Sequence, residues 1–116
     1  MGILRKKIKI AGPEKEKEVE AIIDIASSYS AIPKILAEEL GIKELFKRKV
    51  PVPPNGKEAE VPIGAGTVSV NGCSRASIFY ILDGNVLLGQ PELQSFDAEI
   101  DWKKETIRIR QCSPLI

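Results

Sequence analysis

The chain has 116 residues and a mass of 12.7 kDa, which suits one domain with a hydrophobic core of its own. Its 17 basic and 16 acidic side chains leave a net charge of +1, so it has no general electrostatic attraction toward nucleic acid or an anionic membrane. Because it has no histidine and only two distant cysteines, Cys73 and Cys112, the usual zinc ligand sets and histidine-based catalytic triads are excluded.

The first half of the sequence predicts a hairpin and a short helix. Residues 7–10 alternate between basic and apolar side chains, and residues 19–23 form a second apolar run after a Gly-Pro turn with alternating charges. A helix is expected from Pro33 to the stop at Gly41, with Ile35, Leu36 and Leu40 on one face.

The second half reads as mostly short β segments separated by turns. Strand-like runs are expected, followed by a brief helical candidate at 91–96 and a last pair of strands across a four-residue turn. This spacing is typical of a compact barrel or sandwich. The expected strands cover 49–52, 57–63, 66–70, 73–82, 85–89, 98–101 and 106–110.

Two motifs that resemble functional signatures have simpler interpretations. Gly64 and Gly66 begin a G-x-G pattern, but no third glycine or following helix completes it, so we expect turn glycines. Ser27 and Ser28 lack a histidine partner and a G-x-S-x-G setting, so we expect them to form local hydrogen bonds in a turn.

Asp24 is the candidate with the clearest chemical meaning. It interrupts the apolar run 21–26 where a strand ends, and an unpaired buried carboxylate there would be costly. The residues by themselves leave two interpretations open. Asp24 is either a turn or capping residue, which is common after strands, or a functional carboxylate.

The segment EAIIDIASSYSAIPKILAEELGI, followed by VLLGQPELQSFDAEIDW, resembles the retropepsin-like aspartic proteases, a family that includes retroviral proteases and cellular relatives. In that family an apolar strand ends in Asp-Thr-Gly-Ala or Asp-Thr-Gly-Ser. A short helix, a flap hairpin and an apolar-apolar-Gly element before a second helix follow. The matching features occur here in the same order: Asp24 with Ser27, Ile32-Pro33, Leu40-Gly41, a hairpin at 53–56, and Leu87-Leu88-Gly89.

The resemblance implies a mainly β fold for residues 1–116 as a single domain. This fold is a closed barrel of short antiparallel strands with a flap hairpin and two short helices, assembling as a two-fold homodimer. The flap, which covers a bound substrate in this family, would be formed by Pro53, Pro54, Asn55 and Gly56.

The resemblance also implies a mechanism in which Asp24 from each of two subunits forms a catalytic dyad. Two carboxylates that lie close together share a proton. One acts as general base on a water, and the protonated one hydrogen-bonds the scissile carbonyl of a peptide or protein substrate. No metal and no organic cofactor is required.

The active-site loop departs from the family at Ile25 and Ala26, where the family has Thr and Gly before the position of Ser27. The family Thr makes a hydrogen bond across the dimer axis that Ile cannot make, and losing it costs about 1 to 3 kcal/mol at each site. The family Gly lets the backbone approach the carboxylates, and the methyl group of Ala26 crowds that space.

Three functions are therefore compared. The first is an aspartic endopeptidase weakened by Ile25 and Ala26, and the retained Asp24 favours it. The second is a catalytically inactive relative that binds a peptide or serves for dimerisation, which the two replacements favour. The third is an ordinary β-rich interaction domain with a chance likeness to the family.

No apolar run is long enough to span a membrane, and the basic start MGILRKK is not followed by a secretory apolar segment. We therefore expect a cytoplasmic protein without membrane or nucleic-acid partners. The two cysteines are expected to be unpaired in a reducing compartment, although the sequence leaves a disulfide open.

Overall fold

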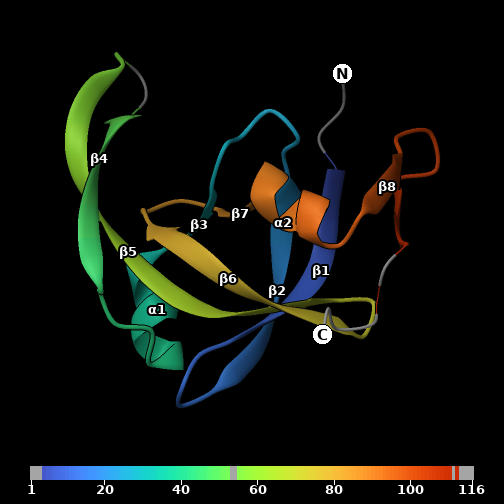
Figure 1. The fold of residues 1–116 in the computed structure, drawn as a ribbon, viewed down its shortest axis with the longest axis horizontal. Coiled ribbons are helices and arrows are strands. Elements are labelled where there is room, and N and C mark those ends of the chain that lie inside the picture. The colour runs from blue at the N-terminus through green and yellow to red at the C-terminus, as the bar shows by residue number, and fades with distance from the viewer. Residues whose placement is uncertain (1–3, 53–54, 111, 113–116) are drawn as a thin grey trace.

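The computed structural model describes residues 4–52, 55–110 and 112. Most of this part is β structure, with two short helices (Figure 1). The strands are β1 Leu4–Ala11, β2 Glu16–Ile23, β3 Ser30–Ile32, β4 Phe46–Val52, β5 Lys57–Val70, β6 Cys73–Ile81, β7 Val86–Leu88, β8 Ala98–Asp101 and β9 Thr106–Ile109, and the helices are α1 Lys34–Leu40 and α2 Gln90–Ser95.

Six strands close into a barrel. They pair in the order β1-β2-β7-β3-β6-β5, and β5 pairs back onto β1, while β4 is added to the outer part of β5. The predicted closed barrel with two short helices is confirmed. One difference is that the β2–β7 and β3–β6 pairs are parallel, because these strands are joined by long connections rather than hairpins.

The barrel interior is filled by the apolar face of each strand. In β1 the alternation of basic and apolar residues places Leu4, Ile8 and Ile10 inside and the basic side chains toward solvent. β1 and β2 form the expected antiparallel hairpin. The core also contains Phe79 from β6 and Phe96, which follows α2.

β5 is one continuous strand, so the expectation that Gly64 and Gly66 form a turn is wrong. The first half of β5 pairs with β4, and a later part pairs with β1, with the two glycines near the change of partner. A Cβ atom at position 64 would lie 2.5 Å from Cγ2 of Ile42, and one at position 66 would lie 2.7 Å from the carbonyl oxygen of Ala11. Glycine therefore allows close packing against β5.

Helix α1 has the predicted limits. It follows Pro33 and ends at Gly41, whose φ of 79° is the left-handed conformation that glycine favours. Leu36 and Leu40, four residues apart, are buried, but Ile35 is 79% exposed, so its expected place on the buried face is wrong. No helix in the described ranges is long and apolar enough to cross a membrane.

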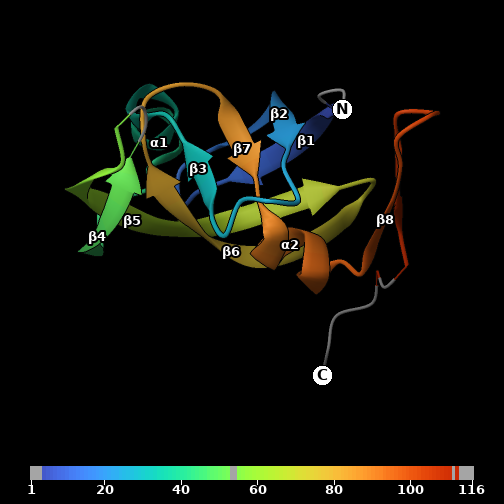
Figure 2. The ribbon, with the colours of Figure 1, turned by 90° about the horizontal axis from the view of Figure 1, so that it is seen from above.

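Two hairpins extend from opposite sides of the barrel (Figures 1 and 2). One is β4–β5, and the other is the separate β8–β9 sheet. The expectation of unpaired cysteines is wrong, since Cys73 at the start of β6 forms a disulfide with Cys112, which comes after β9. The two residues are 39 positions apart in sequence, so their proximity is set by the fold and not by local spacing.

Candidate functional site

Asp24 is the first residue after β2, in the loop that connects β2 to β3. Its backbone N–H donates a hydrogen bond of 3.0 Å to the carbonyl oxygen of Leu88 in β7. This bond continues the parallel pairing of β2 with β7, in which Ile23 is the register partner of Leu88. The backbone of Asp24 is thus fixed by the ends of two paired strands. Figure 2 shows the loop after β2 passing beside α2.

The carboxylate of Asp24 is half-buried in the single chain. Its Oδ1 atom accepts a hydrogen bond of 3.0 Å from the backbone N–H of Ala26, which is an Asx-type turn. Within the described residues, Oδ2 has no hydrogen-bond or ion-pair partner. The turn interpretation and the functional interpretation are therefore compatible, because the turn holds one oxygen and leaves the other available.

Ser27 connects the Asp24 loop to neighbouring residues by hydrogen bonds. Its hydroxyl donates a hydrogen bond of 2.7 Å to the carbonyl oxygen of Tyr29, and its own carbonyl accepts one of 2.9 Å from the N–H of Gln90. The expected local hydrogen bonding of Ser27 is confirmed. The bond to Gln90 additionally links the loop to the start of α2.

Gly89, at the junction of β7 and α2, packs directly against this loop. A Cβ atom at this position would overlap the carbonyl oxygen of Tyr29 and would lie 3.1 Å from that of Ser27. Its φ of −99° is not in the left-handed region, so the requirement for glycine here is space. The apolar-apolar-Gly element thus allows the loop and α2 to meet.

Sequence reasoning missed a buried polar cluster behind the loop. Glu92 of α2 accepts hydrogen bonds from the hydroxyls of Ser30 and Ser77, the latter at 2.8 Å. The Ser30 hydroxyl in turn accepts a bond of 2.8 Å from the N–H of Gly89. Glu92 lies in the first turn of α2, where acidic residues are common, and Ser30 and Ser77 belong to two paired strands, β3 and β6, that are far apart in sequence. Only the fold brings them together.

The surface next to Asp24 is partly apolar. Ile25 is 47% exposed and Trp102, in the β8–β9 turn, is 40% exposed. Both line a hollow of about 350 Å³ together with Leu93 and Ile100, and the polar residues Gln90, Gln94 and Asp97 line it as well. This surface joins the loop, α2 and β8, and in the single chain it is open to solvent.

The predicted flap lies at the turn of the β4–β5 hairpin. Pro53 and Pro54 lie outside the described residues. Asn55 and Gly56 are exposed, the Asn55 side-chain oxygen accepts a hydrogen bond of 3.2 Å from the N–H of Lys57, and Gly56 has a φ of 70°. A turn at this place is therefore confirmed, and its role as a flap stays a prediction.

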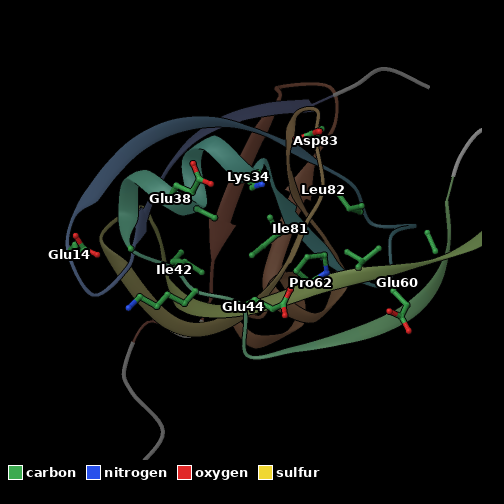
Figure 3. A pocket seen from close by; sticks show the side chains of 15 residues that line it. Glu14, Lys34, Glu38, Ile42, Glu44, Glu60, Pro62, Ile81, Leu82 and Asp83 are labelled. Atoms are coloured by element: carbon green, nitrogen blue, oxygen red, sulfur yellow. The ribbon is translucent and has the colours of Figure 1, made fainter.

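A second hollow, of about 780 Å³, lies beside α1 (Figure 3). It lies between α1, the segment after α1, residues 59–62 of β5 and residues 81–83. Its lining includes apolar side chains such as Ile42 and Ile81 and several carboxylates. Asp24 and the rest of its loop do not line it. It is therefore distinct from the candidate active site, although it is larger.

The closed barrel, the Asp24 loop after β2 and the Gly89 junction before α2 together define a retropepsin-like fold. Solved structures share it. The retroviral protease-like domain of Ddi1 from Leishmania major is 18% identical, with a TM-score of 0.70, covering 95% of this chain and 90% of that one. EIAV protease, solved with the inhibitor HBY-793, is 15% identical, with a TM-score of 0.64, covering 86% of this chain and 93% of that one.

The likeness is visible in the structure rather than in the sequence as a whole. No protein-family model matches the chain, and no curated protein matches it by sequence. At these identities the comparison establishes the fold.

Proposed function

We propose that the chain is one half of a homodimeric aspartic endopeptidase. The observation that carries this proposal is Asp24, whose backbone is fixed between β2 and β7 and whose Oδ2 atom has no partner among the described residues. A single chain supplies one such carboxylate, and a second copy related by a two-fold axis would supply the other. The exposed apolar surface beside Asp24 supports this pairing, since open apolar surfaces commonly mark interfaces.

In the proposed dimer the two Asp24 carboxylates share one proton, because two negative charges so close together are unfavourable. The ionised carboxylate removes a proton from a water, which attacks the peptide carbonyl. The protonated carboxylate donates a hydrogen bond to the carbonyl oxygen, where negative charge develops. The Oδ1 bond from Ala26 fixes the orientation of each carboxylate during these steps.

Ile25 and Ala26 weaken this proposed site to different extents. The Ala26 N–H still donates to Asp24 as a backbone group, so that stabilising contact does not require glycine. Ile25 has no hydroxyl for a bond across the dimer axis. We therefore attribute most of the expected loss of activity to Ile25.

A non-catalytic function is the second candidate, and Ile25 and Ala26 favour it, because they replace the Thr and Gly of the family. In this case the same dimer would bind a peptide beneath its hairpins without cutting it. The neighbours do not decide between the two candidates, because one is described as a protease with an inhibitor and the other as a protease-like domain.

A peptide library incubated with the protein from acid to neutral pH tests the proposal. Cleavage that is lost in the Asp24→Asn variant supports the endopeptidase. Binding of library peptides without cleavage in either protein would favour the non-catalytic candidate. If the protein neither binds nor cleaves peptides, both candidates are wrong.

The proposed dimer predicts a specific effect of Trp102→Glu. A charge in an apolar interface should weaken self-association by at least about tenfold. Sedimentation velocity over a concentration series measures this effect. Ile35→Glu is a matched control, because Ile35 is also exposed and α1 lies at the end of the molecule away from β8 (Figure 2). A parent protein that is monomeric at roughly tens of micromolar would contradict the proposed dimer.

The proposed flap predicts fast amide exchange at the turn of the β4–β5 hairpin. Asn55 and Gly56 are exposed and lie beyond the paired part of the hairpin, so their amides should exchange much faster than those of Ile22 and Leu88 in the barrel. Hydrogen exchange followed by NMR measures the rates. Equal protection at the turn and in the barrel would exclude a hairpin that opens for substrate.

We also propose that residues 1–116 act as a single retropepsin-like domain. The cytoplasmic location expected from the sequence stays a prediction. The Cys73–Cys112 disulfide is an observation against it, because disulfides are rare in the reducing cytosol.

A further inference from the structure

Glu92 is a buried carboxylate that the proposed mechanism does not use. It is only 7% exposed, although it lies in the first turn of α2. Within the described ranges it forms no ion pair, and its hydrogen-bond partners are the neutral hydroxyls of Ser30 and Ser77. A buried negative charge is costly unless a cation compensates it.

The hydrogen bonds around Glu92 leave room for a further donor. The Ser30 hydroxyl accepts a bond from the N–H of Gly89, so its hydrogen points to Oε1 of Glu92. The Ser77 hydroxyl donates to Oε2. An ionised carboxylate has about four acceptor positions, so about two remain unused.

Glu92 and both serines line a hollow of about 440 Å³ between α2, β5 and β6. One wall contains the rings of Tyr29 and Tyr80, which are stacked with centroids 4.4 Å apart. Another wall is formed by the small residues Ala65, Gly66 and Ala76. The hollow therefore combines a carboxylate, aromatic rings and space for a slim chain.

Arg48 of β4 is the cation that lines this hollow, but it is held by other groups. Its guanidinium donates a hydrogen bond of 3.1 Å to the hydroxyl of Tyr80 and lies 5.7 Å from the ring centroid of Phe46. No ion pair joins it to Glu92 among the described residues. Glu92 therefore has no cationic partner among the described residues.

We propose that this hollow binds the cationic side chain of an arginine or lysine from a peptide, with the guanidinium or ammonium group on Glu92. A cation compensates the buried charge and fills the unused acceptor positions, and the tyrosine rings add cation–π attraction. A peptide is the favoured source because Ser28 and Tyr29, which line the hollow, belong to the same loop as Asp24. The site does not depend on catalysis by Asp24.

Binding is tested by NMR titration with N-acetyl-arginine N-methylamide and with the citrulline analogue, in which a neutral urea replaces the guanidinium. Both the parent and the Asp24→Asn variant are used, so that a failure of the endopeptidase proposal does not affect the result. We expect shifts at Ser30, Ser77 and Glu92 and at least about tenfold weaker binding of the citrulline analogue. Agmatine, which carries a guanidinium group but no peptide groups, tests whether the ligand is instead a free small molecule. Weaker binding of agmatine than of the blocked arginine supports a peptide source, and much tighter binding would overturn that source.

Three variants make the test specific. Glu92→Gln keeps the shape and removes the charge, and should weaken arginine binding by at least about tenfold. Ala76→Phe fills the hollow from its exposed side without altering the buried cluster, and should also abolish binding. Arg48→Met removes the competing cation and should strengthen binding. The proposal is overturned if the arginine and citrulline probes bind equally, or if the folded Ala76→Phe variant binds as well as the parent.

Discussion

The double substitution Ile25→Thr and Ala26→Gly is expected to increase Asp24-dependent peptide cleavage by about a hundredfold, the size of effect that one well-placed donor has on a reaction. The introduced hydroxyl would restore a hydrogen bond across the proposed dimer axis and hold the two carboxylates coplanar. The introduced glycine would remove a methyl group beside the catalytic water. Ile25→Thr by itself should give most of the gain, because the backbone N–H of residue 26 already donates to Asp24.

The measurement compares the parent, the single variant, the double variant and a triple variant that also carries Asp24→Asn. All four are assayed with one peptide library at a matched fraction of dimer. The triple variant should be inactive. A double variant that dimerises but cleaves nothing would favour the non-catalytic function and leave Asp24 as a turn residue.

Gly89→Ala is expected to lower the free energy of unfolding by about 3 kcal/mol, near the upper end of the usual cost of overpacking. The added methyl group would overlap the carbonyl oxygen of Tyr29, which is a backbone atom and cannot rotate away. The junction of β7 and α2 would have to move away from the Asp24 loop. Activity should fall together with stability, since the loop loses its fixed position.

Denaturant unfolding measures the change, and Gly72→Ala is the matched control. A Cβ atom at Gly72 meets no atom within 4 Å, but its φ of 82° disfavours alanine. The control should therefore cost only about 1 to 2 kcal/mol. If Gly89→Ala proved no more destabilising than Gly72→Ala, the close contact of Gly89 with the loop would not constrain the site.

Local patterns predicted the elements whose determinants lie close together in sequence. The β1–β2 hairpin follows from the alternation around Ile8 and Ile10, and the end of α1 follows from Gly41. The final hairpin followed from two short strand-like segments, 98–101 and 106–110, on both sides of the four-residue turn at 102–105. In each case the residues that decide the structure lie within a few positions of one another.

Features set by distant parts of the chain could not be predicted in this way. Gly64 and Gly66 looked like turn residues because the side chains and carbonyls that crowd β5 come from other segments. Ile35 was expected on the buried face of α1, but it is exposed and its neighbour Leu36 is buried. The packing of α1 on the barrel decides which face is buried, and the local sequence does not show it. The pairing of Cys73 with Cys112 likewise depends on where the chain passes after β9.

The candidate site was predicted in part. The motif around Asp24 identified the loop after β2 as the candidate site. The hydrogen bonds of Ser27 to Tyr29 and Gln90 agree with the place of Ser27 in that motif. Glu92 was missed, because an acidic residue in the first turn of a helix is usually exposed and stabilises the helix dipole. The polar partners that make it unusual, Ser30 and Ser77, come from β3 and β6.

Crosslinking of an Asp24→Cys variant tests most directly whether two copies of the site meet at a two-fold axis. Two carboxylates that share a proton must be near neighbours, so two thiols at the same position should lie within reach of a disulfide. Under mild oxidation we predict rapid formation of a covalent dimer, with mass spectrometry locating the link between the introduced thiols. An Ile35→Cys variant controls for random collisions. Crosslinking of the Asp24→Cys variant that is no faster than this control would contradict the proposed dyad.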